Sequence, residues 1–393
     1  MTVPPPQPLT DISREAWSLR EGVTYLNHGA FGPSPHVVQQ AQQRWQEQLE
    51  SEPVDFFLRA LAPALESSLA KLAEFVHAPA EDLVFLDNST VAMNVVARSV
   101  TLGPGDEVVV TDHDYGAVHR IWQHECARQG AKLVVCEVPT PIRTSDDWCD
   151  AILGNINNST RLVVFSHVTS PTAIVLPVVK LCTELRQRNI PTCIDGPHAI
   201  AMQPLQIAAL DCDFYTASCH KWLCGPFGSG FLYANPRVQA DIQPVVTSWG
   251  RPLTDADYRW QDEFLWQGTR DVASKLAVAT AIDFINDIGL DRFRQQTHAL
   301  AQYARHRLGE LTGLPHLTPD STEHYGSMVA VPLPPGEAQP LQDKLWNEHR
   351  IEVPIIEWNG QRLLRVSCHL YTTPSEIDRL IDALAKILPG EKQ

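Results

Sequence analysis

The sequence predicts an α/β fold with a mostly parallel sheet, and three observations support that prediction. Between residues 80 and 235, short apolar runs alternate with longer amphipathic or polar stretches. The chain has 393 residues, more than one hydrophobic core usually serves, so we expect a large domain and a smaller one. Polar residues directly follow several of the apolar runs, which is where the ligand site of such a sheet lies.

Seven apolar runs rich in Val, Ile, Leu and Phe are the expected strands of this sheet. They are Leu83–Leu86, Glu107–Thr111, Lys132–Val138, Arg161–Val168, Pro191–Ile194, Phe214–Ala217 and Gly230–Tyr233. The helical segments between them are typical of crossovers that join parallel strands. We therefore assign residues 20–271 to a large domain that contains a seven-stranded sheet.

After about residue 272 the pattern changes to long helical stretches followed by a second set of strands. The helical stretches are Ala273–Ile288 and Leu290–Leu311, and the strand-like runs are Ser327–Leu333, Ile351–Ile356 and Arg362–Cys368. The last helix is predicted from Thr373-Pro374-Ser375-Glu376, which offers an N-cap, a proline at the first helical position and a capping-box Glu. We expect residues 272–393, together with segment 1–19, to form a smaller α/β domain.

Composition and charge exclude several classes of partner. The formal charge of −15, from 46 acidic and 31 basic residues, would repel a nucleic-acid backbone. No run is long enough to span a bilayer, and Met1 to Trp17 lacks the pattern of a secretory signal. The nine cysteines are scattered singly without a CxxC pair, so we expect reduced thiols in a cytoplasmic protein. We expect no metal site, since the adjacent Cys219 and His220 flank a better-explained lysine.

That lysine, Lys221, follows an apolar strand and precedes a glycine-rich turn, Gly225–Gly230. Desolvation lowers the pKa of a lysine and makes the amine a nucleophile toward an aldehyde, although a lone lysine is more often a solvated surface residue. Asp195 ends the preceding apolar strand, where a buried carboxylate is costly unless it is paired. A protonated pyridine nitrogen would pair with it and act as an electron sink. Together the two residues predict pyridoxal 5'-phosphate, bound to Lys221 as a Schiff base.

Other residues near these strand ends fit the remaining parts of that cofactor. Asn88-Ser89-Thr90 follows a strand and opens the helical stretch Val91–Val100, so Ser89 and Thr90 could bind a phosphate at a helix N-terminus. The same pattern is also an ordinary N-cap. Ser218 and His220, beside the lysine, could complete the phosphate site. His198 could contact the ring hydroxyl or be a hydrogen-bonded loop histidine.

With these motifs the chain resembles the class V aminotransferase superfamily of fold-type I pyridoxal phosphate enzymes. Ser218-Cys219-His220-Lys221 matches the Ser-Gly-His-Lys signature of its cysteine desulfurases in three of four positions. Three further motifs resemble the isopenicillin N epimerase-like branch: Tyr25-Leu26-Asn27-His28-Gly29-Ala30-Phe31-Gly32, Ser166-His167-Val168-Thr169-Ser170-Pro171-Thr172-Ala173 and Gln267-Gly268-Thr269-Arg270-Asp271. The resemblance covers nearly the whole chain and implies the fold-type I fold.

The resemblance also implies roles for residues that spacing alone does not single out. It implies that His113 or Tyr115 stacks on the cofactor ring, and that Thr169 or Ser170 lies near the ring hydroxyl. Thr269 would reach the phosphate of the neighbouring subunit's cofactor, which implies a homodimer with active sites at the subunit interface.

Arg365 matches the arginine that clamps the substrate α-carboxylate in this superfamily. A planar guanidinium suits a bidentate carboxylate contact, and an arginine inside an apolar strand needs an anionic partner. An internal Asp or Glu would serve as well as a ligand. Asn27 and His28 are candidates for the other side of a small amino-acid substrate.

The reaction depends on the groups that surround Cα. Lys221 is the expected base on one face, whereas His28, His113, Tyr115 and Tyr371 all remain candidates for the other face. Cysteine desulfurases resemble one another in placing a cysteine shortly before the carboxylate-binding arginine, but residues 341–365 contain none, and we expect Cys368 to be packed.

We therefore predict an isopenicillin N epimerase-like enzyme that abstracts the Cα proton and ends in epimerisation or carbon-sulfur β-elimination. A class V aminotransferase, a cysteine desulfurase-like enzyme and a regulatory protein that binds pyridoxal phosphate without catalysis are the alternatives.

Overall fold

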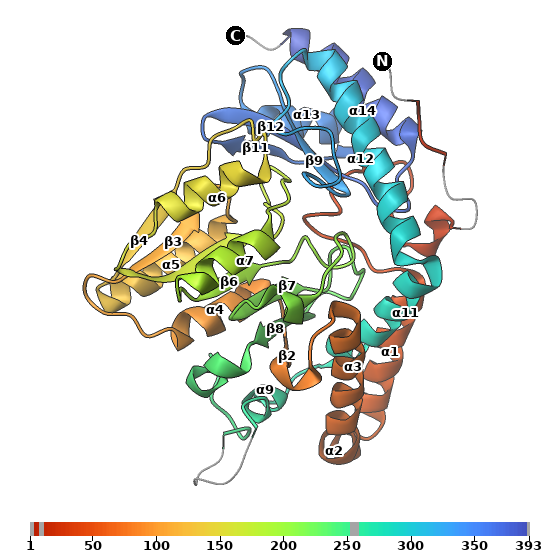
Figure 1. The fold of residues 1–393 in the computed structure, drawn as a ribbon. Coiled ribbons are helices and arrows are strands. Elements are labelled where there is room, and N and C mark those ends of the chain that lie inside the picture. The colour runs from red at the N-terminus through yellow and green to blue at the C-terminus, as the bar shows by residue number, and fades with distance from the viewer. Residues whose placement is uncertain (1–3, 8–11, 252–258, 391–393) are drawn as a thin grey trace.

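A computed structural model describes residues 4–7, 12–251 and 259–390 (Figure 1). Its main feature is a seven-stranded sheet with the order β2-β8-β7-β6-β5-β3-β4. The strands are β2 (Leu83–Leu86), β3 (Glu107–Thr111), β4 (Lys132–Cys136), β5 (Thr160–Ser166), β6 (Thr192–Asp195), β7 (Phe214–Ser218) and β8 (Gly230–Ala234). Only β8 runs antiparallel to its neighbours. The predicted seven-stranded, mostly parallel sheet is confirmed.

Two strands end earlier than the apolar runs that predicted them. The strand β4 stops at Cys136 and β5 stops at Ser166, whereas the apolar runs continue to Val138 and Val168. Both valines are nonetheless buried, at 2% exposure each. An apolar side chain predicts burial but not strand pairing, and these two residues are buried in loops that lie outside the strands of the sheet.

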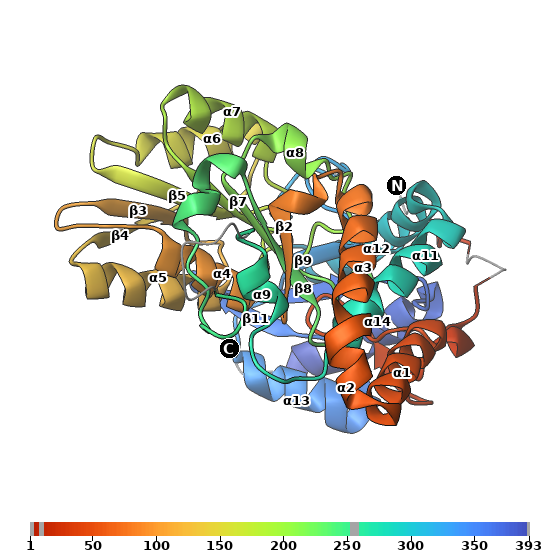
Figure 2. The same ribbon diagram turned by 90° about the horizontal axis from the view of Figure 1, so that it is seen from below.

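Helices cover both faces of the sheet and make a three-layer arrangement. Figure 2 shows α6 (Ser145–Gly154), α7 (Val178–Gln187) and α8 (Ile207–Leu210) on one side. The helices α4 (Ser89–Ser99) and α5 (Gly116–Gln129) lie on the other. Side chains alternate across a strand, so Val109 packs in the core beneath α6 and α7, whereas Val108 and Val110 pack in the core beneath α4 and α5.

A smaller antiparallel sheet lies above the large one in Figure 1, with the order β11-β12-β9. It contains β9 (Met328–Pro332), β11 (Ile355–Trp358) and β12 (Gln361–Ser367), and it shares a separate core with α12 (Leu290–Thr312), α13 (Ala338–His349) and α14 (Pro374–Ile387). The predicted cap of α14 is confirmed, because the Thr373 hydroxyl accepts from the Glu376 amide and the Glu376 carboxylate accepts from the Thr373 amide. The single strand expected at 351–356 is interrupted at Pro354, which lacks an amide hydrogen.

The first part of the chain contacts both cores. The strand β1 (Thr24–Tyr25) pairs in parallel with β10 (Ile351–Glu352), and the next residue, Leu26, packs in the core of the smaller sheet. The helices α1 (His36–Ser51) and α3 (Leu61–Val76) pack beside α10 (Ala273–Leu276) and α11 (Val278–Ile288). The helix α2 (Pro53–Asp55) and the π turn Phe56–Ala60 connect α1 to α3.

The domain boundaries at residues 20 and 272 stay predictions, and residues 1–3 and 8–11 of segment 1–19 lie outside the described part. The remaining short elements are the 3-10 turns Arg14–Ala16, Ala80–Asp82, Pro236–Asp241 and Leu388–Gly390, and α9 (Asp262–Leu265). Within the described ranges, no helix combines the length and apolar composition that crossing a bilayer requires.

Candidate active site

A cavity of about 350 Å³ lies beyond the carboxyl ends of β5, β6 and β7. Most of the residues expected at a cofactor site line it: Ser89, Thr90, Tyr115, Ser170, Asp195, His198, Ser218, His220, Lys221 and Arg365. The parallel strands bring these distant segments together, because their carboxyl ends meet at one edge of the sheet.

Asp195 and Lys221 form an acid-base pair at one end of the cavity. Asp195 is 6% exposed and accepts a 3.1 Å hydrogen bond from the Thr216 hydroxyl. Burial raises the pKa of this carboxyl, although the positive charge of Lys221 acts in the opposite direction. Desolvation lowers the pKa of Lys221, and Arg365 lowers it further, whereas Asp195 raises it. The site therefore favours an uncharged amine, the form that attacks an aldehyde.

His198 lies between the lysine and the protein interior. Its Nε2 atom is 3.1 Å from Lys221 Nζ, and its Nδ1 atom accepts a 3.3 Å hydrogen bond from the Trp222 indole. Burial and the neighbouring lysine hold the pKa of His198 well below its usual range. Of the two readings left open by the sequence, the structure shows a hydrogen-bonded histidine that also borders the cavity.

The N-terminus of α4 reaches the cavity at the end of β7. Asn88 caps the helix by accepting from the Val91 amide at 2.9 Å, so the N-cap is the residue before the two expected phosphate ligands. The Ser218 hydroxyl accepts from the Ser89 amide at 2.9 Å and lies 3.2 Å from the Ser89 hydroxyl. Gly230 allows this approach, because a Cβ there would lie 2.7 Å from the Asn88 Cα. Helix N-terminal amides and hydroxyls here suit a phosphate.

Arg365 reaches the cavity from β12 of the smaller sheet. Its Nη1 atom donates to the carbonyl oxygen of Ser170 at 2.6 Å and to the Ser170 hydroxyl at 3.1 Å. The side chain is 5% exposed, and its Nε atom is buried without a hydrogen-bond partner among the described residues. Both partners of Nη1 belong to a serine rather than to an acidic side chain, so the internal ion pair considered from the sequence is not what holds this arginine. A carboxylate ligand would supply the missing anion.

Asn27 lies close to this arginine through the backbone. It forms an isolated parallel bridge with Ser367, two residues after Arg365 on the same strand. Its amide nitrogen donates to Glu352 at 3.1 Å, and its buried Oδ1 atom has no partner among the described residues. Asn27 itself does not line the cavity.

The structure separates the two candidates for stacking on the cofactor ring. Tyr115 lines the cavity and is 51% exposed. His113 is fully buried away from it, where its Nδ1 atom lies 2.8 Å from the Thr172 hydroxyl and its ring packs 4.3 Å from that of Trp358. Tyr115 is therefore placed for contact with a bound group, and His113 is not.

Three other expected site residues also lie off the cavity. Thr169 is fully buried and bonds to the Thr172 hydroxyl at 2.7 Å, so Ser170 is the member of that pair at the cavity. Thr269 is exposed and does not line this chain's cavity. His28 sits directly behind the lysine, with Nε2 3.0 Å from the Lys221 carbonyl oxygen and Nδ1 2.8 Å from the Tyr371 hydroxyl.

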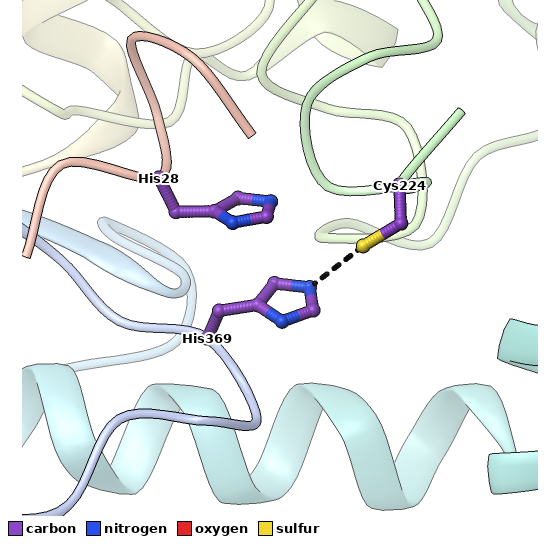
Figure 3. A group of neighbouring side chains, drawn as sticks. All are labelled: His28, Cys224 and His369. Atoms are coloured by element: carbon purple, nitrogen blue, oxygen red, sulfur yellow. Dashed lines mark hydrogen bonds between the residues drawn. The ribbon is translucent and has the colours of Figure 1, made fainter. Parts of the chain in front are cut away.

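His28 belongs to a buried cluster with Cys224 and His369, which the sequence did not predict (Figure 3). The two imidazole rings stack with centroids 4.0 Å apart and planes 17° apart, and His369 Nε2 lies 3.3 Å from the Cys224 sulfur. Nitrogen lone pairs lie in the ring plane, so nearly parallel stacked rings do not converge on one ion. Both nitrogens of His28 are also already bonded. The cluster packs the wall behind Lys221.

Sequence reasoning missed Asp114, which orders the loop that carries Tyr115. Its carboxylate accepts from the Thr111 amide at 2.7 Å and from the amide and hydroxyl of Ser166 at 2.8 and 2.7 Å. Ser166 lines the cavity, so the contact ties two neighbouring strand ends together. The only signal was an acidic residue after one strand and a serine at the end of the next, which many loops share.

Comparisons with known proteins agree with this geometry. The isopenicillin N epimerase of Amycolatopsis lactamdurans is 36% identical over 95% of this chain and 98% of that protein. The enzyme of the same name from Streptomyces clavuligerus is 35% identical over 94% and 96%. The crystal structure of the cysteine desulfurase CsdA from Escherichia coli shares the fold, with a TM-score of 0.81, 22% identity and coverage of 96% of this chain and 98% of that one.

A family assignment follows from these matches. Residues 24–380 match the aminotransferase class-V family, which spans both sheets and every residue that lines the cavity. The expected enzyme class, the pyridoxal phosphate cofactor and the fold-type I fold are thereby confirmed. The chain belongs to the aminotransferase class-V family of pyridoxal phosphate-dependent enzymes.

Proposed function

We propose that this enzyme epimerises a small amino acid by moving the Cα proton between two side chains, Lys221 and Tyr115. The observation that carries the proposal is that both side chains line one cavity, which they reach from different strands of the sheet. The strands that lead to them, β7 and β3, are three positions apart in the sheet, which corresponds to about 14 Å. Two isopenicillin N epimerases are 36% and 35% identical to this chain over more than 90% of both lengths, which supports the same reading.

The residues that line the cavity fit each part of pyridoxal phosphate. Lys221 would bond covalently to the aldehyde carbon, Asp195 would pair with the ring nitrogen, and His198 would donate toward the ring hydroxyl. Ser89, Thr90, Ser218 and His220 would hold the phosphate. When bound, the cationic ring withdraws electrons from Cα and so weakens the bond to its proton.

Arg365 would bind the substrate carboxylate through its buried guanidinium, whose Nε atom lacks a partner. The Ser170 contacts fix the guanidinium plane and so orient the carboxylate. We propose that Asn27, whose Oδ1 atom is also unpartnered, contacts the amino-acid end of the substrate from the N-terminal loop after a small adjustment.

Tyr115 is the one candidate for the second proton carrier that reaches the cavity. His28 and Tyr371 bond to one another behind the lysine, and His113 is buried elsewhere. A phenol on one side and an amine on the other allow a proton to leave one face of Cα and arrive on the opposite face. The configuration at Cα inverts when one group removes the proton from its face and the other group delivers a proton to the opposite face.

A desulfurase reaction is less well supported, because it needs an accessible thiolate. All nine cysteines lie within the described residues and all nine are buried. Burial also raises the pKa of the Cys368 thiol, the cysteine nearest to Arg365 in sequence. Carbon-sulfur β-elimination needs no such thiol and remains the second outcome to test.

The test is to incubate the holoenzyme in D2O with a panel of L-amino acids and cysteine conjugates. Deuterium at Cα, the D-isomer, pyruvate and sulfide are measured by NMR and chiral chromatography. We expect the D-isomer with deuterium at Cα. Pyruvate with sulfide and no D-isomer would assign β-elimination instead, whereas alanine with sulfur transfer would overturn both readings.

The role of Tyr115 is tested with Tyr115→Phe, which keeps the ring and removes the phenol. We expect the D-isomer rate to fall about 100-fold while the recovered L-isomer still gains deuterium from the Lys221 side. Tyr303→Phe is the matched control, because its hydroxyl donates to Asp378 far from the cavity. Equal losses of exchange and inversion in Tyr115→Phe would contradict the two-sided mechanism.

We also propose a homodimer in which Thr269 completes the partner's phosphate site. Support comes from its exposure and from the large exposed side chains Phe31 and Phe227, at 65% and 55%, near the cavity. Sedimentation should give a dimer, and Thr269→Glu should weaken cofactor binding without unfolding the protein. The nine free cysteines support a cytoplasmic location.

A further inference from the structure

The indole of Trp222 limits how His198 can hold its proton. Trp222 is fully buried, and its Nε1 atom lies 3.3 Å from His198 Nδ1. An indole N–H is a donor only, so Nδ1 must accept and cannot carry a hydrogen. A neutral imidazole whose Nδ1 atom accepts bears its single hydrogen on Nε2.

That hydrogen points at the reactive lysine. His198 Nε2 lies 3.1 Å from Lys221 Nζ, so an Nε2–H donates to the lone pair of an uncharged amine. A lysine ammonium would instead bring two donors together, because Nε2 would have no lone pair to offer. The Trp222 and Lys221 contacts are therefore compatible only when His198 is the Nε2–H tautomer and Lys221 is neutral.

We propose that Trp222 is a positioning residue that fixes the Nε2–H tautomer of His198 and thereby holds Lys221 as the free amine that captures the cofactor. The inference rests on Lys221 being the anchor, which is part of the proposed function. It assigns a role to a side chain that does not line the cavity.

The charged and titratable groups around Lys221 do not fix its protonation state by themselves, so the contact with His198 can influence it. Asp195 on β6 favours the ammonium and Arg365 on β12 opposes it, so the two charges act in opposite directions on the lysine pKa. His220 lies beside the lysine in the chain, and His28 bonds to the lysine carbonyl rather than to its amine. Burial holds the pKa of both histidines low, at about 4 and about 3, so neither adds a charge near neutral pH.

The first test reads the tautomer directly in the wild-type chain and does not depend on any variant folding well. Full-length protein freed of cofactor is labelled with ¹⁵N-histidine, and the His198 signals are assigned by their absence in His198→Gln. We expect a protonated Nε2 and an unprotonated Nδ1 at pH 7.5. A protonated Nδ1 overturns the proposal.

The second test measures how fast the cofactor-free protein captures pyridoxal phosphate as a function of pH, followed by visible absorption. The rate rises with pH as Lys221 loses its proton. Trp222→Phe lets His198 move its hydrogen to Nδ1, so that Nε2 can accept from an ammonium. We expect the rise to move about one pH unit higher, with capture about 10-fold slower at the acidic end.

Two controls separate this effect from a general loss of packing. Trp122→Phe also removes a fully buried indole with a hydrogen bond, to Met93, but it should leave the pH profile in place. In a His198→Gln background, Trp222→Phe should add no further shift, because no tautomer remains to be fixed. An equal shift in both backgrounds, or the same shift in Trp122→Phe, overturns the proposal.

These assays contain no amino-acid substrate, so they separate the inference from the proposed reaction. If Lys221→Ala still captures the cofactor, the anchor itself is wrong and the proposed function fails with it. If capture needs Lys221 but is insensitive to Trp222, only the positioning role fails.

Discussion

The residues that line the cavity form a buried group around Lys221, which we call the closed end, and an exposed group, which we call the open end. The difference in burial separates fixed chemistry from access. At the Lys221 end, Asp195 and Arg365 are 6% and 5% exposed, and His198 has both ring nitrogens bonded. In the exposed group, Tyr115 and Phe31 are 51% and 65% exposed. Desolvation sets protonation states at the closed end. The exposed residues of the open end are accessible to a substrate.

Replacing Lys221 is the strongest test of this comparison, and we expect the largest effect there. Lys221→Ala removes the proposed covalent anchor and the proposed base of the closed end, so Cα proton exchange should fall by at least about 10⁴-fold. Exchange is followed by deuterium loss at Cα from labelled substrate. Retention of more than about one percent of the wild-type rate would place the chemistry at the open end instead.

Arg365 tests whether the closed end also binds the substrate. Arg365→Lys keeps the charge but loses the planar fork, and kcat/KM should fall about 100-fold for amino acids. Arg362→Lys, on the same strand but away from the cavity, is the matched control. Amines that lack a carboxylate should lose little activity in Arg365→Lys; an equal loss with them would argue for a structural role.

Replacing Ser218 tests whether the closed end binds the cofactor phosphate together with the N-terminus of α4. Ser218→Ala removes the hydroxyl that accepts from the Ser89 amide, and the dissociation constant for pyridoxal phosphate should rise about 5- to 10-fold. The constant is measured by equilibrium dialysis. Ser99→Ala, which removes a buried hydroxyl at the far end of the same helix, should leave it unchanged.

The smallest effect concerns the buried wall behind the lysine. Burial lowers the pKa of His28 to about 3, below its usual value near 6.5. Between these values the unfolded chain binds the proton and the folded chain does not, so stability falls as pH falls below 6.5. From pH 7.5 to 5.5, His28 should account for about 1.4 kcal/mol of lost unfolding free energy.

Urea unfolding of the wild type and of His28→Asn at the two pH values isolates this contribution. The variant is expected to be less stable at both values, yet its stability should change less between them. Identical pH slopes in the two proteins would mean that His28 binds a proton as readily in the folded chain as in the unfolded chain.

Sequence patterns predicted the large sheet well because its strands are short, apolar and bounded by turns. They failed where burial and ladder pairing differ, as at Val138 and Val168, and where a proline interrupts an apolar run, as at Pro354. They also did not anticipate the contacts of β1 and Leu26 with the smaller sheet, since two residues carry no periodicity.

Some residues of the candidate site could likewise be predicted from the sequence and others could not. Lys221, Asp195 and Ser218 could be named from the sequence because they lie together at or just after the ends of apolar strands. Arg365 could be named because it matches the carboxylate-binding arginine of the family that the chain resembles. The choice of Tyr115 over His113, or of Ser170 over Thr169, could not, since neighbours in a loop point in directions that only the surrounding contacts define.

The sequence by itself determined the fold class and predicted the lysine proposed to bind the cofactor, because hydrophobic periodicity and residue chemistry are local properties. Its motifs identified the family by resemblance. Only the tertiary structure decided which aromatic side chain reaches the cavity, which histidines are packed behind it, and that Trp222 bonds to His198. Those features depend on side chains that lie far apart in the chain or turn to different sides of one loop. Their protonation depends on burial, which exists only once the chain has folded.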